Sequence, residues 1–293
     1  MERAKTPRIK PILRALVLTL GGLGLLLGVI VLGQRNNAPP SRCADGMVAL
    51  GTRCCGEGQT LQGTACIGKP KRCAKGLVVT DEGCLAAPRV INIAEGKLRI
   101  GPSDWEAEGQ VKPQEVQIPA FAIDAYEVTE ARYAKCVAEA ACPPLTPSSE
   151  PGRAIANITL HEAITFCKWA GGTLPTPEQL AFVAAGPQGR RYAWGDTGAV
   201  CRRAAWGLTK GPCGEGATAP EITGSHPDGI SPEGIHDLAG NVAEWATTTN
   251  PNLAEARGGS YADAAASALR SWNRRELNPN TRSPEIGFRC VYR

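Results

Sequence analysis

The sequence is poor in aromatic residues and in histidine. Phe, Trp and Tyr account for 5% of the 293 residues, whereas glycine (34) and proline (23) are abundant. Such a composition argues against a helical bundle and indicates a loop-rich fold. The three histidines, His161, His226 and His236, are scattered along the chain. A lone histidine is more often a core or surface residue than a metal ligand, so none of them indicates a metal centre.

A basic face is also missing. The formal net charge is +4, and residues 1–14 alone supply it, because they hold five Lys and Arg against one Glu, and five minus one is four. The rest of the chain is balanced. Proteins that bind nucleic acid neutralise phosphates with Lys and Arg, so we expect no nucleic acid among the partners.

One long apolar run is present, from Ala15 to Gly33, and Thr19 is its only polar side chain. As a helix this run would span roughly 28 Å, close to the thickness of a bilayer core. The basic residues 1–14 precede it, and the positive-inside rule then places them in the cytoplasm and the remainder of the chain outside. We therefore expect a single-pass inner (cytoplasmic) membrane protein whose C-terminal domain is periplasmic or extracellular. The alternative is a cleaved signal peptide, for which residues 31–33 form a weak cleavage motif.

Twelve cysteines predict an oxidising, extracytoplasmic compartment. After a linker at 34–42, residues 43–87 contain a threefold repeat with ten residues between paired cysteines and a glycine three after the first. Each unit has a short apolar run before a turn, which predicts a small β-hairpin closed by its own disulfide. The repeat favours the pairs Cys43–Cys54, Cys55–Cys66 and Cys73–Cys84, although other connectivities stay open. Zinc binding is the weaker interpretation, because the segment has no C-x2-C pair and no histidine.

Three helix starts are marked by capping residues. Thr129 precedes an expected helix at about 130–139, Thr159 forms a capping box with Glu162, and Thr176 precedes a proline at the first helical position. Strands are expected at 90–93, 98–100 and 121–129. Two local disulfides are expected, Cys136 with Cys142 and Cys201 with Cys213.

The stretch Gly234–Trp245 contains the clearest candidate for a metal site. Asp237 and Glu244 bracket the main-chain carbonyls of Gly240 and Val242, and Ca²⁺ takes several oxygen ligands of this kind. The alternative is structural: Asp237 caps a turn, Glu244 makes a surface ion pair and Trp245 is a core residue.

Several blocks together resemble the formylglycine-generating enzyme or sulfatase-modifying factor family. Resemblance extends from about residue 88 to the C-terminus, and the blocks occur in the family's order. It implies an α+β, C-type-lectin-like fold with little regular secondary structure at 88–293. The blocks are Phe121–Thr129, Phe166–Thr176, Tyr192–Asp196, Gly234–Trp245, Arg257–Tyr261 and Gly287–Cys290.

The resemblance implies a structural calcium held by Asp237, Gly240, Val242 and Glu244. It also implies a long-range disulfide between Cys167 and Cys290.

Catalysis is where the chain departs from the family. Members that make formylglycine bind copper through two cysteines shortly after the Gly-Gly-Ser block, because a soft metal needs sulfur ligands. Those positions hold Asp263 and Ala268 here, so no copper is expected and no catalytic residue is assigned. The scattered histidines also do not match the iron site of the related sulfoxide synthases.

The expected function is therefore a membrane-anchored, non-catalytic protein that binds a peptide, glycan or envelope partner. A polar pocket for that partner is expected near Asp263, formed with Arg270, Trp272 and Arg275. One alternative is a formylglycine-generating-type oxidoreductase or a related enzyme with an altered active site. Another is a structural assembly component of the envelope, in which the repeat module acts as a spacer or docking unit.

Overall fold

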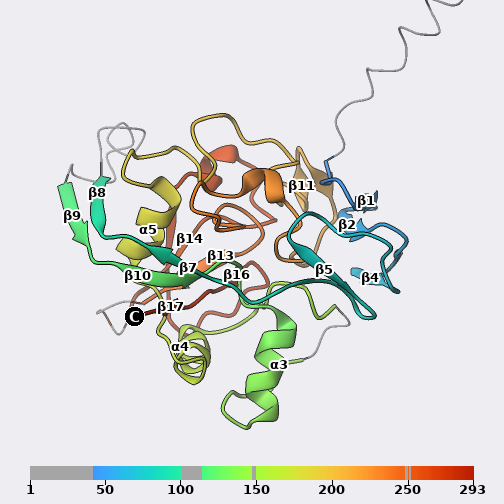
Figure 1. Cartoon of the computed structure of the whole chain (residues 1–293), viewed down its shortest axis with the longest axis horizontal. Helices are drawn as coiled ribbons and strands as arrows, with labels where there is room; N and C mark the ends of the chain where they lie inside the picture. Colours follow the sequence, from blue (N-terminus) through green and yellow to red (C-terminus); the bar gives the residue numbers. More distant parts are fainter. Residues whose placement is uncertain (1–41, 101–113, 147–149, 248–249, 251) are drawn as a thin grey trace, which may run out of the picture. The chain divides into compact units, whose positions relative to one another are not determined.

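The computed structural model in Figure 1 describes residues 42–100, 114–146, 150–247, 250 and 252–293. The predicted cytoplasmic tail at 1–14, the membrane anchor at 15–33 and all of the linker except Arg42 lie outside these residues. Within the described part of the chain, no helix is long and apolar enough to cross a membrane.

The three cysteine repeats fold as three antiparallel hairpins, each crossed by one disulfide: Cys43–Cys54, Cys55–Cys66 and Cys73–Cys84. These are the pairs that the spacing favours. The turns of the first two hairpins contain Gly51 and Gly63, whose φ angles of +56° and +60° suit glycine. Figure 1 shows the hairpins together, on the side of the domain away from β8 and β9. Their strands are β1 (Met47–Leu50), β2 (Arg53–Gly56), β3 (Thr60–Gln62), β4 (Ala65–Ile67), β5 (Leu77–Thr80) and β6 (Gly83–Ala86).

The rest of the chain forms short strands in several small sheets. A three-stranded sheet has the order β17-β10-β7, and a four-stranded sheet has the order β15-β14-β13-β16, in which β13 and β16 are parallel. Two further hairpins are β8-β9 and β11-β12. Small sheets joined by long loops agree with the glycine-rich and proline-rich composition. The strands are β7 (Val90–Ile93), β8 (Gly96–Ile100), β9 (Gln114–Ile118), β10 (Phe121–Asp124), β11 (Lys210–Gly211), β12 (Gly214–Glu215), β13 (Ala243–Ala246), β14 (Ala254–Arg257), β15 (Arg274–Leu277), β16 (Ile286–Gly287) and β17 (Val291–Tyr292).

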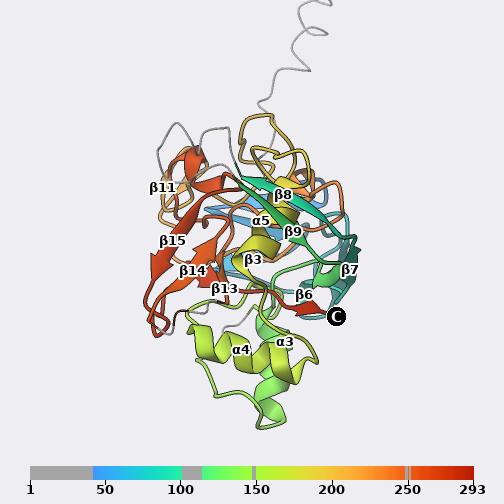
Figure 2. The same cartoon turned by 90° about the vertical axis from the view of Figure 1, so that its left-hand side faces the viewer.

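The helices begin where the capping residues predict. Thr129, Thr159 and Thr176 are the N-caps of α3 (Glu130–Ala138), α4 (Leu160–Trp169) and α5 (Pro177–Ala185), and the last two carry complete capping boxes. Two 3₁₀ turns, η2 (Pro227–Gly229) and η3 (Ala266–Leu269), lie in the loop regions. Helix α5 packs against β8, β9 and β14, whereas α3 and α4 lie together at another end of the domain (Figure 2).

The hydrophobic core ties α4 to the last strands. Phe166 on α4 meets Phe288 edge-on, with ring centroids 5.3 Å apart. Cys167 and Cys290 form the long-range disulfide that the family resemblance implies. The fully buried Trp245 on β13 donates its indole N–H to the carbonyl of Ile158, at 2.8 Å. Strand β13 is thereby held in the interior, which places the acidic side chain of its second residue in a dry environment.

Candidate functional sites

Glu244, the second residue of β13, makes a buried ion pair rather than a surface one. Its two carboxylate oxygens accept hydrogen bonds from Arg289, with Nε–Oε2 at 2.7 Å and Nη2–Oε1 at 2.6 Å. The Arg289 side chain is 0% exposed and also donates to the carbonyls of Asp124 (3.2 Å) and His236 (2.8 Å). Burial raises the pKa of Glu244, and Arg289 opposes that rise.

Asp237 lies near Glu244 but faces different partners. Its Oδ2 atom accepts the backbone N–H of Gly224 at 2.5 Å, and its own φ of +54° is left-handed, which aspartate tolerates in turns. The backbone N–H of Gly240 donates to the carbonyl of Gly258 at 2.9 Å. The loop is therefore already closed by hydrogen bonds within the chain.

A third buried carboxylate, Glu127, was not singled out from the sequence. Its Oε2 atom accepts from the Asn241 side-chain amide at 2.6 Å, and its Oε1 atom accepts from the Val242 N–H at 3.1 Å. Burial, reinforced by the charges of Asp237 and Glu244, raises the pKa of Glu127 well above its usual range.

One of the four predicted calcium ligands, Glu244, already pairs with a cation in this arrangement. Both Glu244 oxygens receive N–H groups of Arg289, and that guanidinium already supplies the positive charge that Ca²⁺ would bring. A calcium ion bound by Asp237, Gly240, Val242 and Glu244 would have to displace Arg289 from a fully buried position, against the repulsion of two cations. Calcium at this loop stays a prediction, with Arg289 as its competitor.

Asp263, which the family resemblance places at the first copper position, is a carboxylate with several hydrogen-bond partners. Asp263 accepts from the backbone N–H of Ser260 at 2.7 Å, from the Ser260 hydroxyl at 3.0 Å and from Arg275. Arg275 also donates to Glu285, with Nη1–Oε2 at 2.8 Å. Asp263 and Arg275 remain partly exposed, at 23% and 27% of their side-chain surface. Ala268, which the resemblance places at the second copper position, has only a methyl side chain.

The four residues of the predicted polar pocket form two pairs that differ in exposure to solvent. Asp263 and Arg275 form the partly exposed pair just described. Trp272 is only 3% exposed and belongs to the hydrophobic core, and the guanidinium of Arg270 lies over its ring at 6.0 Å from the centroid. The expectation that Trp272 lines a surface pocket is therefore wrong, because packing in the core hides its ring from any ligand.

Every cysteine of the chain is in a disulfide, and the pairs are the expected ones. The remaining local bridges are Cys136–Cys142 and Cys201–Cys213. A cysteine ligates a metal as a thiolate, and a disulfide sulfur cannot take that form. In the oxidised chain no thiol is left for a soft metal.

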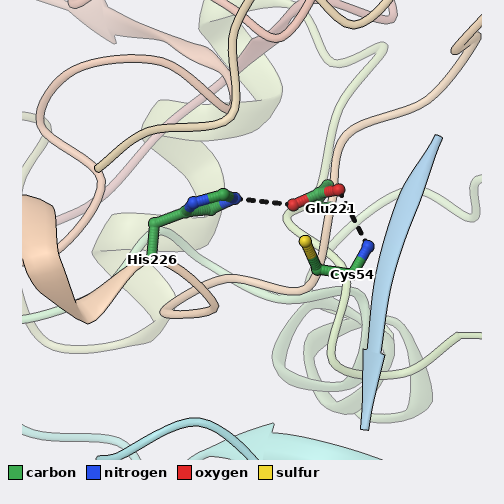
Figure 3. A group of neighbouring side chains, drawn as sticks. All are labelled: Cys54, Glu221 and His226. Carbon is green, nitrogen blue, oxygen red and sulfur yellow. Dashed lines mark hydrogen bonds and ion pairs between the residues drawn. The ribbon is translucent and has the colours of Figure 1, made fainter. Parts of the chain in front are cut away.

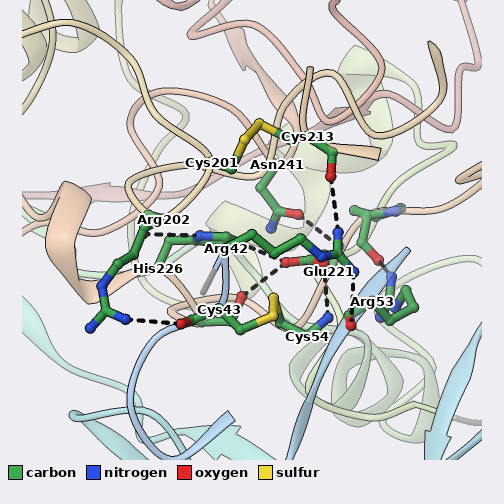
Figure 4. Close-up of polar contacts among 12 residues, drawn as sticks. Arg42, Cys43, Arg53, Cys54, Cys201, Arg202, Cys213, Glu221, His226 and Asn241 are labelled. Carbon is green, nitrogen blue, oxygen red and sulfur yellow. Dashed lines mark hydrogen bonds and ion pairs between the residues drawn. A yellow bond between two sulfur atoms is a disulfide. The ribbon is translucent and has the colours of Figure 1, made fainter. Parts of the chain in front are cut away.

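Charged side chains attach the first hairpin to the domain, as Figure 4 shows. Arg42 donates to the carbonyl of Cys213 at 3.2 Å, and Arg202 donates in the opposite direction, from the domain to the carbonyl of Cys43, at 3.1 Å. Sequence reasoning missed this joint, because the partners are more than 150 positions apart, at separations of 171 and 159.

A buried ionic cluster completes the joint. Glu150 accepts from Arg53 of the first hairpin and from Arg153, the latter with Nη2–Oε2 at 2.8 Å. Its other oxygen accepts the backbone N–H of Cys66 at 3.2 Å, and Arg153 donates to the carbonyl of Thr64 at 2.7 Å. One domain carboxylate therefore contacts two hairpins.

Glu221 and His226 form a second buried pair beside this cluster (Figure 3). The Nε2 atom of His226 lies 2.7 Å from Glu221 Oε2, and Glu221 Oε1 accepts the N–H of Cys54 at 3.1 Å. Glu221 raises the pKa of His226 although burial opposes the rise, and the histidine in turn lowers the pKa of Glu221. Both residues belong to the domain, and the hydrogen bond from the Cys54 N–H to Glu221 connects the pair to the first hairpin.

The sequence of the domain matches a known protein family. The sequence model of the sulfatase-modifying factor enzyme 1-like domain matches residues 75–293. The chain belongs to this family. The match begins inside the third hairpin, so this sulfatase-modifying factor family member carries its first two hairpins outside the matched region.

Two curated relatives carry names that differ in activity, one an enzyme and the other inactive. The formylglycine-generating enzyme of Streptomyces coelicolor is 29% identical over 173 residues, covering 49% of this chain and 54% of the relative. The inactive C-alpha-formylglycine-generating enzyme 2 of Mus musculus is 30% identical over 155 residues, covering 47% of this chain and 48% of the relative. This family member thus spans about half the length of the curated relatives it matches.

Among solved structures, PvdO from Pseudomonas aeruginosa superposes with a TM-score of 0.57 at 18% identity, over 73% of this chain and 95% of that one. At this identity the likeness concerns the fold alone.

Proposed function

We propose that this sulfatase-modifying factor family protein is a non-catalytic, membrane-anchored binding protein that presents its domain outside the cytoplasm to a peptide, glycan or envelope partner. The observation that carries the proposal is the state of the two copper positions. Asp263 is hydrogen-bonded to Ser260 and Arg275, and the side chain of Ala268 has no atom that could bind copper. A relative that is named as inactive also supports a non-catalytic role.

The extracytoplasmic setting is supported by the disulfides. Every cysteine is paired, in bridges that include three consecutive hairpins, and such a density of disulfides persists in oxidising compartments. The anchor itself is proposed from the apolar run at 15–33 and its basic flank. Protease protection of spheroplasts tests this topology: added protease should remove the domain and leave a membrane-embedded N-terminal fragment.

Metal binding and oxygen consumption test the absence of copper catalysis. The purified chain should bind no stoichiometric copper(I) and should consume no oxygen with a cysteine-containing peptide. A matched control restores both sulfur ligands as Asp263→Cys with Ala268→Cys, and this variant should gain a copper site because the surrounding backbone is kept. Stoichiometric copper binding with oxygen uptake in the parent chain would overturn the proposal.

Partner binding is tested on peptide and glycan arrays. Arg275 is the partly exposed cation at the former copper position, so the Arg275→Gln variant should weaken a bound probe. Arg99→Gln is the matched control, because Arg99 makes an exposed ion pair with Glu115 on the separate β8-β9 hairpin. Absence of any binder on both arrays would count against a binding role for this domain.

A further inference from the structure

Three different metal-binding atom types converge at the joint between the first hairpin and the domain. Cys54 Sγ, a carboxylate oxygen of Glu221 and a ring nitrogen of His226 all lie within 4.8 Å of one another (Figure 3). The three residues are 1%, 1% and 4% exposed. Sulfur, imidazole nitrogen and carboxylate oxygen are the ligands that zinc takes in proteins, in closed four-coordinate sites when the site is structural.

The histidine is oriented as in zinc sites. Its Nδ1 atom lies 3.3 Å from the carbonyl oxygen of Arg202, and its Nε2 atom points at Glu221. A ligating histidine usually donates its second ring N–H to a carbonyl or carboxylate, which fixes the ring and leaves the other nitrogen for the metal. Arg202 thus already provides the outer contact for His226.

One covalent bond keeps the site closed. Cys54 is bonded to Cys43, so its sulfur has no thiolate form. We propose that reduction of the Cys43–Cys54 disulfide converts this joint into a zinc site, with Cys54, Glu221 and His226 as ligands and Cys43 within reach as the fourth.

The chemistry balances with a dithiol as reductant. The dithiol gives up two electrons and two protons and closes to its own disulfide, while the Cys43–Cys54 S–S bond breaks and each sulfur receives one proton. Zinc then displaces the thiol protons and the proton shared by His226 and Glu221, and these protons pass to solvent. Arg42 and Arg53 place positive charge near Glu221, and the negative charge of the Cys54 thiolate offsets it.

The first hairpin differs from the other two because its disulfide lies beside further metal-binding side chains. Among the described residues, no other set of three His, Cys, Asp or Glu side chains converges in this way. The Cys73–Cys84 bridge has the same spacing of 11 positions, and it therefore provides a matched control.

A single substitution exposes the site without a reductant. In the full chain, Cys43→Ala frees the Cys54 thiol and leaves the other disulfides intact. This variant should bind one Co²⁺, used as the spectroscopic probe for zinc, with a sulfur-to-cobalt charge-transfer band, and zinc should displace it. Cys73→Ala, which frees Cys84, should show no such band. Adding His226→Asn to Cys43→Ala should weaken binding by more than the roughly 10- to 100-fold that loss of an outer contact costs.

Two results would overturn the proposal. One is a folded Cys43→Ala chain, with one titratable thiol, that shows no cobalt band. The other is a band of equal strength in Cys73→Ala, which would indicate binding by any free thiol. If Cys43→Ala fails to fold, the parent chain reduced with a phosphine is measured by native mass spectrometry. Retention of one zinc there, lost with His226→Asn, supports the site, and no retained zinc refutes it.

Discussion

The hairpin module at 43–87 and the domain at 88–293 are stabilised by different means. The buried cluster of the module consists largely of cysteine and alanine, together with Met47, and Ile222 of the domain completes it. The domain has two larger hydrophobic clusters, which include buried aromatic residues such as Phe166 and Trp245. A region with little apolar surface to bury therefore depends on covalent bridges and on charged contacts with its neighbour.

The largest effect is expected in the domain, from loss of its long-range disulfide. Cys167 and Cys290 are 123 positions apart, and on the loop-entropy model a bridge of that length contributes about 5 kcal/mol. Chemical denaturation of Cys167→Ser with Cys290→Ser should show a loss of this order. The Cys73–Cys84 bridge, with a separation of 11, should cost about 3 kcal/mol when removed in the same way. Equal losses would contradict the loop-length argument.

Glu244→Ala should come next in size. It leaves the fully buried Arg289 without its bidentate partner, and breaking such a pair costs about 3–5 kcal/mol. Urea unfolding measures the loss. Glu115→Ala is the matched control, because Glu115 pairs with Lys97 and Arg99 at the surface and should change stability by less than about 1 kcal/mol.

The same variant also examines the calcium prediction. Since Arg289 occupies the cationic position, added Ca²⁺ should leave the thermal midpoint of the parent chain unchanged. A rise in that midpoint which Glu244→Ala abolishes would show that calcium displaces Arg289 from Glu244.

Glu150→Ala should break the joint between module and domain. It leaves Arg53 and Arg153 without a shared carboxylate, at a cost of about 3 kcal/mol. Hydrogen exchange should accelerate at residues 47–67 while the amides of α4 and β13 stay protected. Uniform acceleration across the domain would show that the module and the domain unfold as one unit.

The smallest effect is a pH dependence of the same joint. The raised pKa of His226 contributes stability below its unfolded value of about 6.5, and this stability is lost as the pH rises through the folded pKa. The lowered pKa of Glu221 contributes stability above about 4.5, lost as the pH falls through its folded pKa. The difference in stability between parent and His226→Asn should therefore peak between about pH 4.5 and 6.5. A difference that does not change with pH would indicate that packing, not charge, holds this pair.

Local patterns predicted most of the regular structure. The caps at Thr129, Thr159 and Thr176 act on N–H groups within three residues, so a short window of sequence is enough to read them. The hairpin disulfides are similarly local, since a short turn brings each pair together. Cys167–Cys290 is different, because only the family resemblance pointed to it.

The candidate sites were predicted less well, because each depends on long-range contacts. Trp272 stands among charged residues in the sequence, and this pattern predicts a surface position. Only the packing of the folded chain shows that its ring is buried. Glu127 is an acidic residue within an otherwise alternating segment, which is a signal in the sequence, but its partners Asn241 and Val242 lie more than a hundred positions away.

By itself, the sequence determined where the hairpins and helices form, and its repeat favoured the local cysteine pairs. The family resemblance added the expectation that Asp263 and Ala268 stand where copper-binding members have cysteines. Turn, capping and side-chain chemistry act over a few residues, so they can be read in order along the chain. Only the tertiary structure decided that Arg289 holds Glu244, that Glu150 joins two hairpins to the domain, and that Cys54 faces Glu221 and His226. A buried charge is costly unless it is paired, and the residue that pairs with it is one that the fold brings close, often from a distant part of the sequence.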